Sequence, residues 1–246
     1  QAELRGRIAH GEKDFALWNS ISILAEIMKV YHALELLETQ GINALQKYFE
    51  KLIAESRITG TKAIKSIVTD ANFKSAMFKT GILYEEKVEH PKLIELQKII
   101  DKEIKENPSV KIMVFNQYRD NALDITKKLN SIQNAKANIF VGQQKKGGTG
   151  LSQKEQKEML EAFRNGEFNV LVATSIGEEG LDIPKVDIVI FYEPVPSAIR
   201  SIQRRGRTGR HEKGKVMMLI TKGTRDEVYM WVSHNKEKTM HRNLLA

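Results

Sequence analysis

Short runs of β-branched and aromatic residues alternate with helical stretches in the part of the chain after Pro91. Strands are expected at residues 111–115, 137–141, 169–173, 186–191 and 215–220. Strands that are separated by helices usually pair in parallel, and the helices then cover both faces of the sheet. Ligands bind to such open sheets beyond the carboxyl ends of the strands. Functional side chains are therefore expected in the loops that follow the first four strands.

The residues before this alternation have a helical period. Apolar residues recur there at steps of three and four, which predicts that one helical face is buried. These residues are Leu17, Ile21, Leu24, Met28, Tyr31 and Leu34. Gly41 is expected to end this helix, a second helix is expected at 43–55, and shorter helical segments continue to Gly81. We therefore predict an α/β fold, a parallel sheet flanked by helices at 86–246, preceded by an all-α domain at 1–85.

Composition restricts the classes of function. Basic residues outnumber acidic ones by 39 to 31, for a net charge of +8, which suits a polyanionic partner but also fits a merely soluble basic protein. The chain has no cysteine, which excludes disulfides, thiolate metal sites and cysteine nucleophiles. It contains no long apolar run and no signal-peptide pattern, so a cytoplasmic location is expected. Gln1 lies inside an apparent charged helix, which indicates a piece of a longer protein.

The segment Gln203–Arg210 reads QRRGRTGR and is the strongest chemical signal in the chain. Arginine keeps its charge in any environment and offers a planar fork to two phosphate oxygens. The two interleaved glycines allow close backbone approach, and they make a plain solvated helix a poor explanation. Taken alone, the segment also fits an arginine-rich RNA-binding tract.

Three further segments precede it in a specific order. They are VFNQYR at 114–119, FVGQ at 140–143 with LSQKEQ at 151–156, and ATSIGEEGLDIP at 173–184. Together with QRRGRTGR, these segments resemble motifs IV, IVa, V and VI of superfamily 2 helicases, over roughly residues 90 to 225. The resemblance implies a RecA-like fold and an ATP-dependent helicase, of which this part is the second motor domain.

The resemblance assigns roles in ATP hydrolysis. Arg207 and Arg210 match the arginine fingers, which reach the γ-phosphate of ATP held on the partner domain, and Gln203 matches a residue near the attacking water. A fixed guanidinium stabilises the charge that develops on the transferring phosphoryl group. Asp182 matches the carboxylate that binds the ATP ribose, and Gly180 permits a tight loop. Asp182 also fits a simple turn cap.

The resemblance also assigns contacts to nucleic acid. Thr174 matches a hydroxyl that contacts a phosphate, and the other residues are Gly142, Gln143, Asn116, Gln117 and Arg119. Polar residues after a strand are also common loop formers, so the motif IV residues remain open to that interpretation. Phosphate contacts position a strand without reading its bases, which predicts sequence-independent binding.

The chain lacks the other half of an ATP site. It has no G-x-x-x-x-G-K-[ST] loop, since Thr59–Lys62 fails the spacing, and it has no Asp-Glu-x-His box for magnesium. We therefore expect ATP with Mg²⁺ to be bound mainly by a first RecA-like domain elsewhere in the parent protein, and this chain alone to be inactive.

The helical domain narrows the family. A helical block before the second motor domain is similar to the insertion of the Hef/FANCM family, and also to that of the double-stranded-RNA-sensing helicases. The form QRRGRTGR favours the Hef/FANCM family over the RNA sensors. This resemblance implies that the substrate is branched DNA, such as stalled forks and Holliday junctions, and that the protein is associated with the nucleoid. Hef proteins also carry a nuclease domain after the motor, which we do not assign to this chain.

A basic cluster in the helical domain suggests a further contact. Lys62, Lys65 and Lys74 lie in a stretch where Asp70 is the sole acid, so this end could clamp duplex DNA like a thumb. A solvated helical face explains the cluster equally well. Two other functions remain open: a double-stranded-RNA helicase or sensor, and a non-catalytic nucleic-acid-binding module. A chromatin-remodelling translocase fits poorly, because its motif VI has a different arginine spacing.

Overall fold

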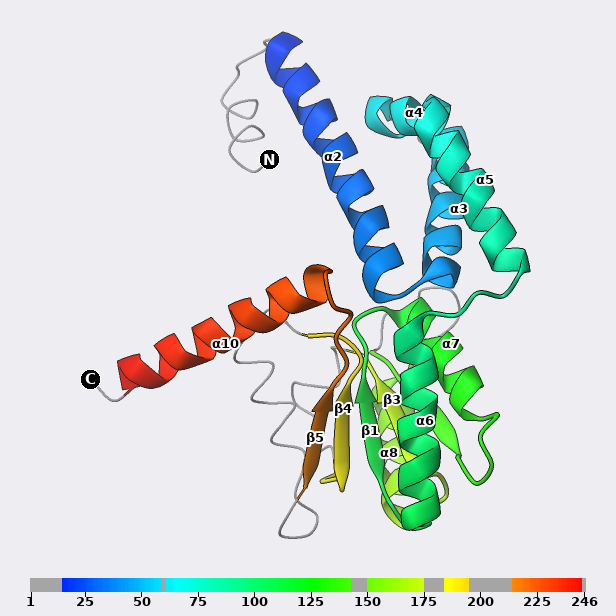
Figure 1. The fold of residues 1–246 in the computed structure, drawn as a ribbon, viewed down its shortest axis with the longest axis vertical. Coiled ribbons are helices and arrows are strands. Elements are labelled where there is room, and N and C mark those ends of the chain that lie inside the picture. The colour runs from blue at the N-terminus through cyan, green and yellow to red at the C-terminus, as the bar shows by residue number, and fades with distance from the viewer. Residues whose placement is uncertain (1–14, 59–60, 143–149, 175–183, 195–213, 245–246) are drawn as a thin grey trace. The chain divides into compact units, whose positions relative to one another are not determined.

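The computed structural model describes residues 15–58, 61–142, 150–174, 184–194 and 214–244. The chain divides into two compact units, Gln1–His90 and Pro91–Ala246. Among the described residues, the first unit contains only helices and the second holds all the strands (Figure 1). The sequence placed the change of domain at residue 85, which is where the last helix of the first unit ends.

The first unit is built from four described helices. They are α2 (Phe15–Thr39), α3 (Ile42–Ile58), α4 (Lys62–Thr69) and α5 (Ala71–Glu85). The predicted stop after α2 is confirmed, because Gly41 has a φ of 97°, a conformation that a side chain would strain. A Cβ there would also lie 2.8 Å from the Cβ of His90. The predicted end at Gly81 is wrong, since α5 continues through that residue.

The prediction of one buried face on α2 is only partly correct. Leu17 is buried, but Met28, Tyr31 and Leu34 are exposed by 56%, 60% and 44%. Trp18, which lies about 100° around the helix from Leu17, is also exposed by 55%, so apolar residues surround α2 instead of forming a single stripe. Periodicity marks where apolar side chains lie, but the neighbouring helices decide how many of them are covered.

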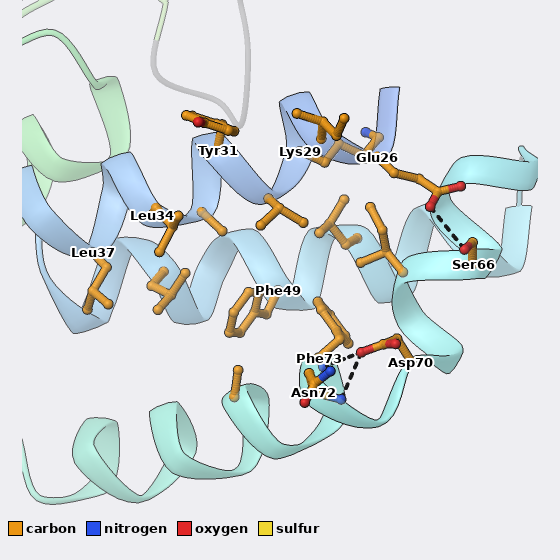
Figure 2. A pocket seen from close by; sticks show the side chains of 17 residues that line it. Glu26, Lys29, Tyr31, Leu34, Leu37, Phe49, Ser66, Asp70, Asn72 and Phe73 are labelled. Carbon is orange, nitrogen blue, oxygen red and sulfur yellow. Dashed lines mark hydrogen bonds between the residues drawn. The ribbon is translucent and has the colours of Figure 1, made fainter. Parts of the chain in front are cut away.

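A groove of about 540 Å³ accounts for part of this exposure. It lies between α2, α3 and α5 and is lined by Leu34, Leu37, Phe49 and Phe73 (Figure 2). At one end Ser66 donates a hydrogen bond of 3.2 Å to Glu26. The exposed apolar residues of α2 therefore line a hollow of the helical unit as well as its outer surface.

Tyr48 on α3 joins that helix to α2. Its hydroxyl donates to the carbonyl of Lys29 at 3.3 Å. Burial, with a smaller contribution from Glu55, raises the pKa of Tyr48 to about 12. The phenol therefore stays neutral at physiological pH and remains available as a donor.

The second unit contains a five-stranded sheet whose neighbouring strands are all parallel. Its strands are β1 (Ile112–Phe115), β2 (Ala137–Phe140), β3 (Val170–Ala173), β4 (Ile188–Phe191) and β5 (Lys215–Met218). Their order in the sheet is β2-β3-β1-β4-β5. All five predicted strands are confirmed, each slightly shorter than predicted. The fold is the predicted parallel α/β sheet.

Helices cover the two faces of this sheet. The described helices are α6 (Pro91–Glu106), α7 (Arg119–Leu129), α8 (Gln153–Asn165) and α10 (Arg225–Leu244). Leu96 of α6 and Ile125 of α7 pack with Val114 on one face, whereas Phe163 of α8 packs with Phe115 on the other. Because both faces are covered, β1, β3 and β4 are buried at every position. None of the helices in the described ranges is long and apolar enough to cross a membrane.

Local interactions define both ends of α8. Ser152 accepts from the backbone N–H of Glu155, and the Glu155 side chain accepts from the backbone N–H of Ser152. This capping box satisfies two donors that the first helical turn leaves unpaired. Gly166 ends the helix with a φ of 81°. These caps fix where α8 begins and ends, and therefore where β3 can start.

A buried ion pair holds α10 to the start of α6. Lys92 Nζ lies 2.8 Å from Asp226 Oδ2, and the two side chains are exposed by only 5% and 0%. The same carboxylate oxygen accepts from the backbone N–H of Thr221 at 2.9 Å. Lys92 Nζ also lies 4.9 Å from the ring centroid of Tyr192. A buried charge whose partner is removed is strongly destabilising.

We therefore predict that Asp226→Asn lowers the free energy of unfolding by about 3–5 kcal/mol, because it leaves the Lys92 ammonium buried and unpaired. Urea denaturation followed by circular dichroism measures this loss. The matched control is Lys98→Met, which removes one partner of the exposed Lys98–Glu95 pair and should cost less than about 1 kcal/mol. A loss below that value for Asp226→Asn would contradict the prediction.

Candidate functional site at the carboxyl edge of the sheet

The first four strands end together at one edge of the sheet. In the register of the pairing, Phe115 lies opposite both Ala173 and Phe191, and Phe140 lies opposite Ala173. Three backbone hydrogen bonds continue beyond these residues: Asn116 N–H to Ala173, Thr174 N–H to Phe140, and Tyr192 N–H to Phe115, at 2.9–3.1 Å. The loops that carry the predicted functional residues therefore start side by side.

Asn116 is placed differently from its predicted role. Its side chain is fully buried, Nδ2 donates to Glu193 Oε2 at 3.0 Å, and Oδ1 accepts from the backbone N–H of Tyr118 at 3.0 Å. The backbone N–H of Gln117 donates to the other oxygen of Glu193. Because the oxygen and the nitrogen of this amide both bind partners within the protein, the structure gives Asn116 a role in shaping the loop. Gln117, in contrast, has an exposed side chain.

Arg119 joins two of the predicted segments. Its Nη2 donates to the carbonyl of Gly142 at 2.7 Å, so the loop after β1 and the loop after β2 are tied together. Gln156 of α8 fixes the second loop further, because its Nε2 donates to the carbonyl of Val141 at 3.0 Å. A guanidinium has five N–H donors, so one bond to a carbonyl leaves it capable of binding an anion as well.

Thr174 lies at the same edge, directly after β3, and is 4% exposed. The remaining predicted site residues lie outside the described residues: Gln143, Gly180, Asp182, Gln203, Arg207 and Arg210. Thr174 and Pro194, at this edge, are the last described residues before 175–183 and 195–213.

No cluster of three or more His, Asp or Glu side chains in the described ranges could hold a metal ion.

Glu193 is a residue of this edge that the sequence motifs do not include. It lies two residues after β4 and is 4% exposed, and both of its carboxylate oxygens accept hydrogen bonds from the loop after β1. A charged residue that directly follows a strongly apolar run, FYE in this sequence, was the available signal. Buried acids are rare unless they are paired or hydrogen-bonded, so such a position indicates an organised polar network.

The basic cluster of the helical unit lies on its surface. Lys62 and Lys65 lie on the side of α4 opposite its buried residues, and Lys74 is exposed on the first turn of α5. Asp70 caps α5 by accepting from the backbone N–H groups of Asn72 and Phe73, and Glu26 of α2 accepts from Ser66 of α4. Among the described residues, no ion pair engages Lys65 or Lys74. Their positive charges are therefore available to an anionic partner.

Two family models match the chain. The helicase conserved C-terminal domain matches residues 92–212, and the helical bundle of a putative ATP-dependent RNA helicase matches residues 1–88. The parallel sheet, its converging loops and the preceding helical bundle define the class of protein: the chain contains the RecA-like second motor domain of a superfamily 2 helicase.

Individual relatives narrow this class. The helicase domain of Pyrococcus furiosus Hef is similar in structure, with a TM-score of 0.71 and 47% identity, covering 94% of this chain and 47% of that chain. The ATP-dependent DNA helicase fml1 of Schizosaccharomyces pombe is 33% identical over 93% of this chain. MJ1505 of Methanocaldococcus jannaschii, named as an ATP-dependent RNA helicase, is 45% identical over 91% of this chain. The chain belongs to the Hef/FANCM family of superfamily 2 helicases, and it spans 28% of the length of each of these two curated relatives.

We predict that Arg119→Gln weakens the binding of single-stranded DNA and reduces the salt dependence of the dissociation constant. Loss of one phosphate contact lowers the slope of log K against log salt by about 0.7 for a single strand. Fluorescence anisotropy over a range of salt concentrations measures both quantities.

The matched control is Lys127→Gln, which removes an equal charge from the exposed last turn of the same helix. It should leave the slope nearly unchanged. If Arg119→Gln keeps the wild-type slope, Arg119 holds the Gly142 loop without contacting a phosphate.

Proposed function

We propose that this chain is the second half of the motor core of an ATP-dependent DNA helicase that unwinds or remodels branched DNA. The observation that carries the proposal is the Arg119–Gly142 bond, which joins motifs IV and IVa at the edge where motif V begins. The names of the relatives support it, since fml1 and the MPH1 protein of Coccidioides immitis are called ATP-dependent DNA helicases. The parent protein would then be found with the nucleoid.

In this proposal the chain supplies half of an ATP site. Arg207 and Arg210 stabilise the charge on the transferring phosphoryl group, and Gln203 orients the attacking water. Asp182, together with Gly180 of the same motif, binds the ribose. The phosphates and Mg²⁺ are held mainly by a first RecA-like domain of the same protein. The chain provides neither the phosphate loop nor the magnesium carboxylates in its sequence.

The other side of the edge binds the DNA backbone. Arg119, the exposed side chain of Gln117, Thr174 and the backbone at Gly142 and Gln143 position one strand. These groups offer donors that suit phosphate oxygens and carry no base information. Asn116 shapes this surface from beneath without touching the DNA.

The helical unit provides a second, duplex-binding surface. Lys62, Lys65 and Lys74 are exposed, and they outnumber the two acids beside them, Asp70 and Glu26, so the patch has a net positive charge. Lys62 is partly held in place, because its Nζ donates to Asn19 at 3.3 Å and lies 5.8 Å from the ring centroid of Phe15. Phosphate contacts of this kind are salt-sensitive and fit a clamp on duplex DNA.

A specific observation favours one alternative substrate. The names of MJ1505 and of the matching helical-bundle model both mention RNA. Substrate tests therefore compare a DNA fork with an RNA duplex of the same sequence. A nuclease domain elsewhere in the parent protein would act separately from the residues of this chain.

We predict that Arg207→Ala or Arg210→Ala lowers fork-stimulated ATP hydrolysis by the parent protein by about a thousandfold, because each removes a charge from the transition state. The measurement is phosphate release at saturating ATP and fork DNA. Arg242→Ala, at an exposed arginine of α10, is the control and should keep the wild-type rate. An unchanged rate for both finger variants would refute the assignment. Stimulated hydrolysis by the wild type would also exclude the non-catalytic alternative.

We also predict that changing Lys62, Lys65 and Lys74 together to Glu weakens fork binding by at least about tenfold at low salt, because attraction to phosphates becomes repulsion. The control makes the same charge change at Lys98, Lys102 and Lys127, on α6 and α7. Equal affinity of the triple variant and the wild type would refute the thumb-like clamp. Tighter wild-type binding to the RNA duplex than to the DNA fork would instead favour the RNA alternative.

A further inference from the structure

We propose that His90, Pro91 and Lys92 form a restricted pivot between the helical unit (Gln1–His90) and the motor unit (Pro91–Ala246). The helical unit holds the side chain of His90 and the motor unit holds that of Lys92, so a single residue separates the two attachments. Rotation of one unit against the other is then confined to the backbone around Pro91. The pivot itself is independent of the proposed function, and only its consequence for unwinding rests on that function.

The side chain of His90 is attached to the turn between α2 and α3. Its Nε2 donates to the carbonyl oxygen of Glu38 at 3.0 Å. Glu38 lies in the last turn of α2, where backbone carbonyls lack partners within the helix, so His90 caps this helix end. Gly41 leaves the space that His90 occupies, since a Cβ on that glycine would lie 2.8 Å from the Cβ of His90.

The connector between α5 and His90 is also fixed to the helical unit. At the end of α5, the N–H of Val88 donates to the carbonyl of Leu83 at 3.0 Å. The N–H of Lys87 donates to the carbonyl of Tyr84 at the same distance. These two bonds form a Schellman motif, with Lys87 in the left-handed conformation at a φ of 55°. Because this motif holds one end and the His90 cap holds the other, the connector has little freedom of its own.

Lys92, on the other side of the pivot, is fixed in the core of the motor unit. Its Nζ pairs with Asp226 at 2.8 Å and lies 4.9 Å from the ring centroid of Tyr192. Both partners belong to the motor unit. Since α6 begins at Pro91, the ion pair holds the first turn of that helix.

The backbone that joins the two attachments has few soft torsions. The ring of Pro91 fixes its φ at about −65°. A residue before proline is restricted to extended conformations, which limits the ψ of His90. The ψ of Pro91 is helical, because Pro91 is the first residue of α6. The torsions between His90 and Lys92 therefore permit only small rotations.

A restricted pivot has a consequence for a motor that binds duplex DNA with its helical unit and tracks one strand at the edge of its sheet. A loose connector would absorb the movement of the motor unit, whereas a restricted pivot transmits it to the helical unit. Hinges in proteins are commonly a few residues at the ends of helices or strands, as here. We therefore expect the pivot to be needed for unwinding and not for ATP hydrolysis.

Distances between spin labels test the pivot directly. The chain has no cysteine, so Lys51→Cys on α3 and Lys102→Cys on α6, both at exposed positions, can be labelled specifically. Double electron–electron resonance on the full chain then gives the distribution of distances between the two units. We expect a single narrow distribution for the doubly labelled chain. Adding Pro91→Gly should make it at least about twice as wide, because glycine removes both restrictions that proline imposes.

The matched control is Val88→Gly, which adds backbone freedom on the helical side of the His90 attachment, at a side chain exposed by 45%. It should leave the width of the distribution nearly unchanged. His90→Ala should broaden the distribution, because the cap on Glu38 is lost. His90→Gln should not, since its amide keeps an N–H donor for that carbonyl.

The consequence for unwinding is measured on the parent protein. Pro91→Gly should lower the rate of fork unwinding severalfold and leave fork-stimulated ATP hydrolysis close to wild type. Each ATP hydrolysed would then open less duplex. Val88→Gly should keep both rates.

Two results of the distance measurement would overturn the pivot. They are a Pro91→Gly distribution as narrow as that of the parent doubly labelled chain, and equal broadening by Val88→Gly and Pro91→Gly. If His90→Ala does not fold, the two glycine variants decide, because both keep the His90 side chain. Wild-type unwinding by Pro91→Gly would overturn the transmitting role. Absence of fork unwinding in the wild-type parent protein would instead refute the motor function, and the distance measurements would still test the pivot.

Discussion

Parallel pairing of β2, β3, β1 and β4 in register is the constraint on which the rest of the site depends. Because Phe140, Ala173, Phe115 and Phe191 lie at the same level of the sheet, four loops far apart in the sequence begin in a row at one edge, each beside the loop of the neighbouring strand. The apolar strands are buried on both faces by α6, α7 and α8. The packing energy of the core therefore holds an edge that itself consists largely of polar groups.

The polar groups at this edge are held by a few buried interactions. Asn116 and Glu193 satisfy one another and the adjacent backbone, and Lys92 and Asp226 pair beneath Tyr192. Buried polar groups gain most from such contacts when every atom has a partner; among the described residues Asp226 Oδ1 has none, whereas Asp226 Oδ2 is bound by both Lys92 and Thr221. The more exposed groups, such as Arg119, can consequently be presented to a ligand in a defined position.

Much of this could be predicted because the relevant signals are local. Alternation of β-branched runs and helical stretches identified all five strands, and Gly41 identified the end of the first long helix. The motifs indicated the edge at which Arg119, Gly142 and Thr174 lie. The orientation of the Asn116 side chain was not predictable in this way. The sequence pattern of a polar residue after a strand is identical whether the side chain faces a phosphate or a buried carboxylate.

The sequence by itself determined the parallel α/β class, the order of the motifs, the family and the missing half of the ATP site, since each depends on residue type and spacing along the chain. Tertiary structure alone decided that Asn116 turns inward to Glu193, that Lys92 meets Asp226, and that Met28, Tyr31 and Leu34 stay exposed on α2. The physical reason is that burial and hydrogen bonding depend on which residues far apart in the chain come into contact. Spacing along the sequence does not specify those contacts.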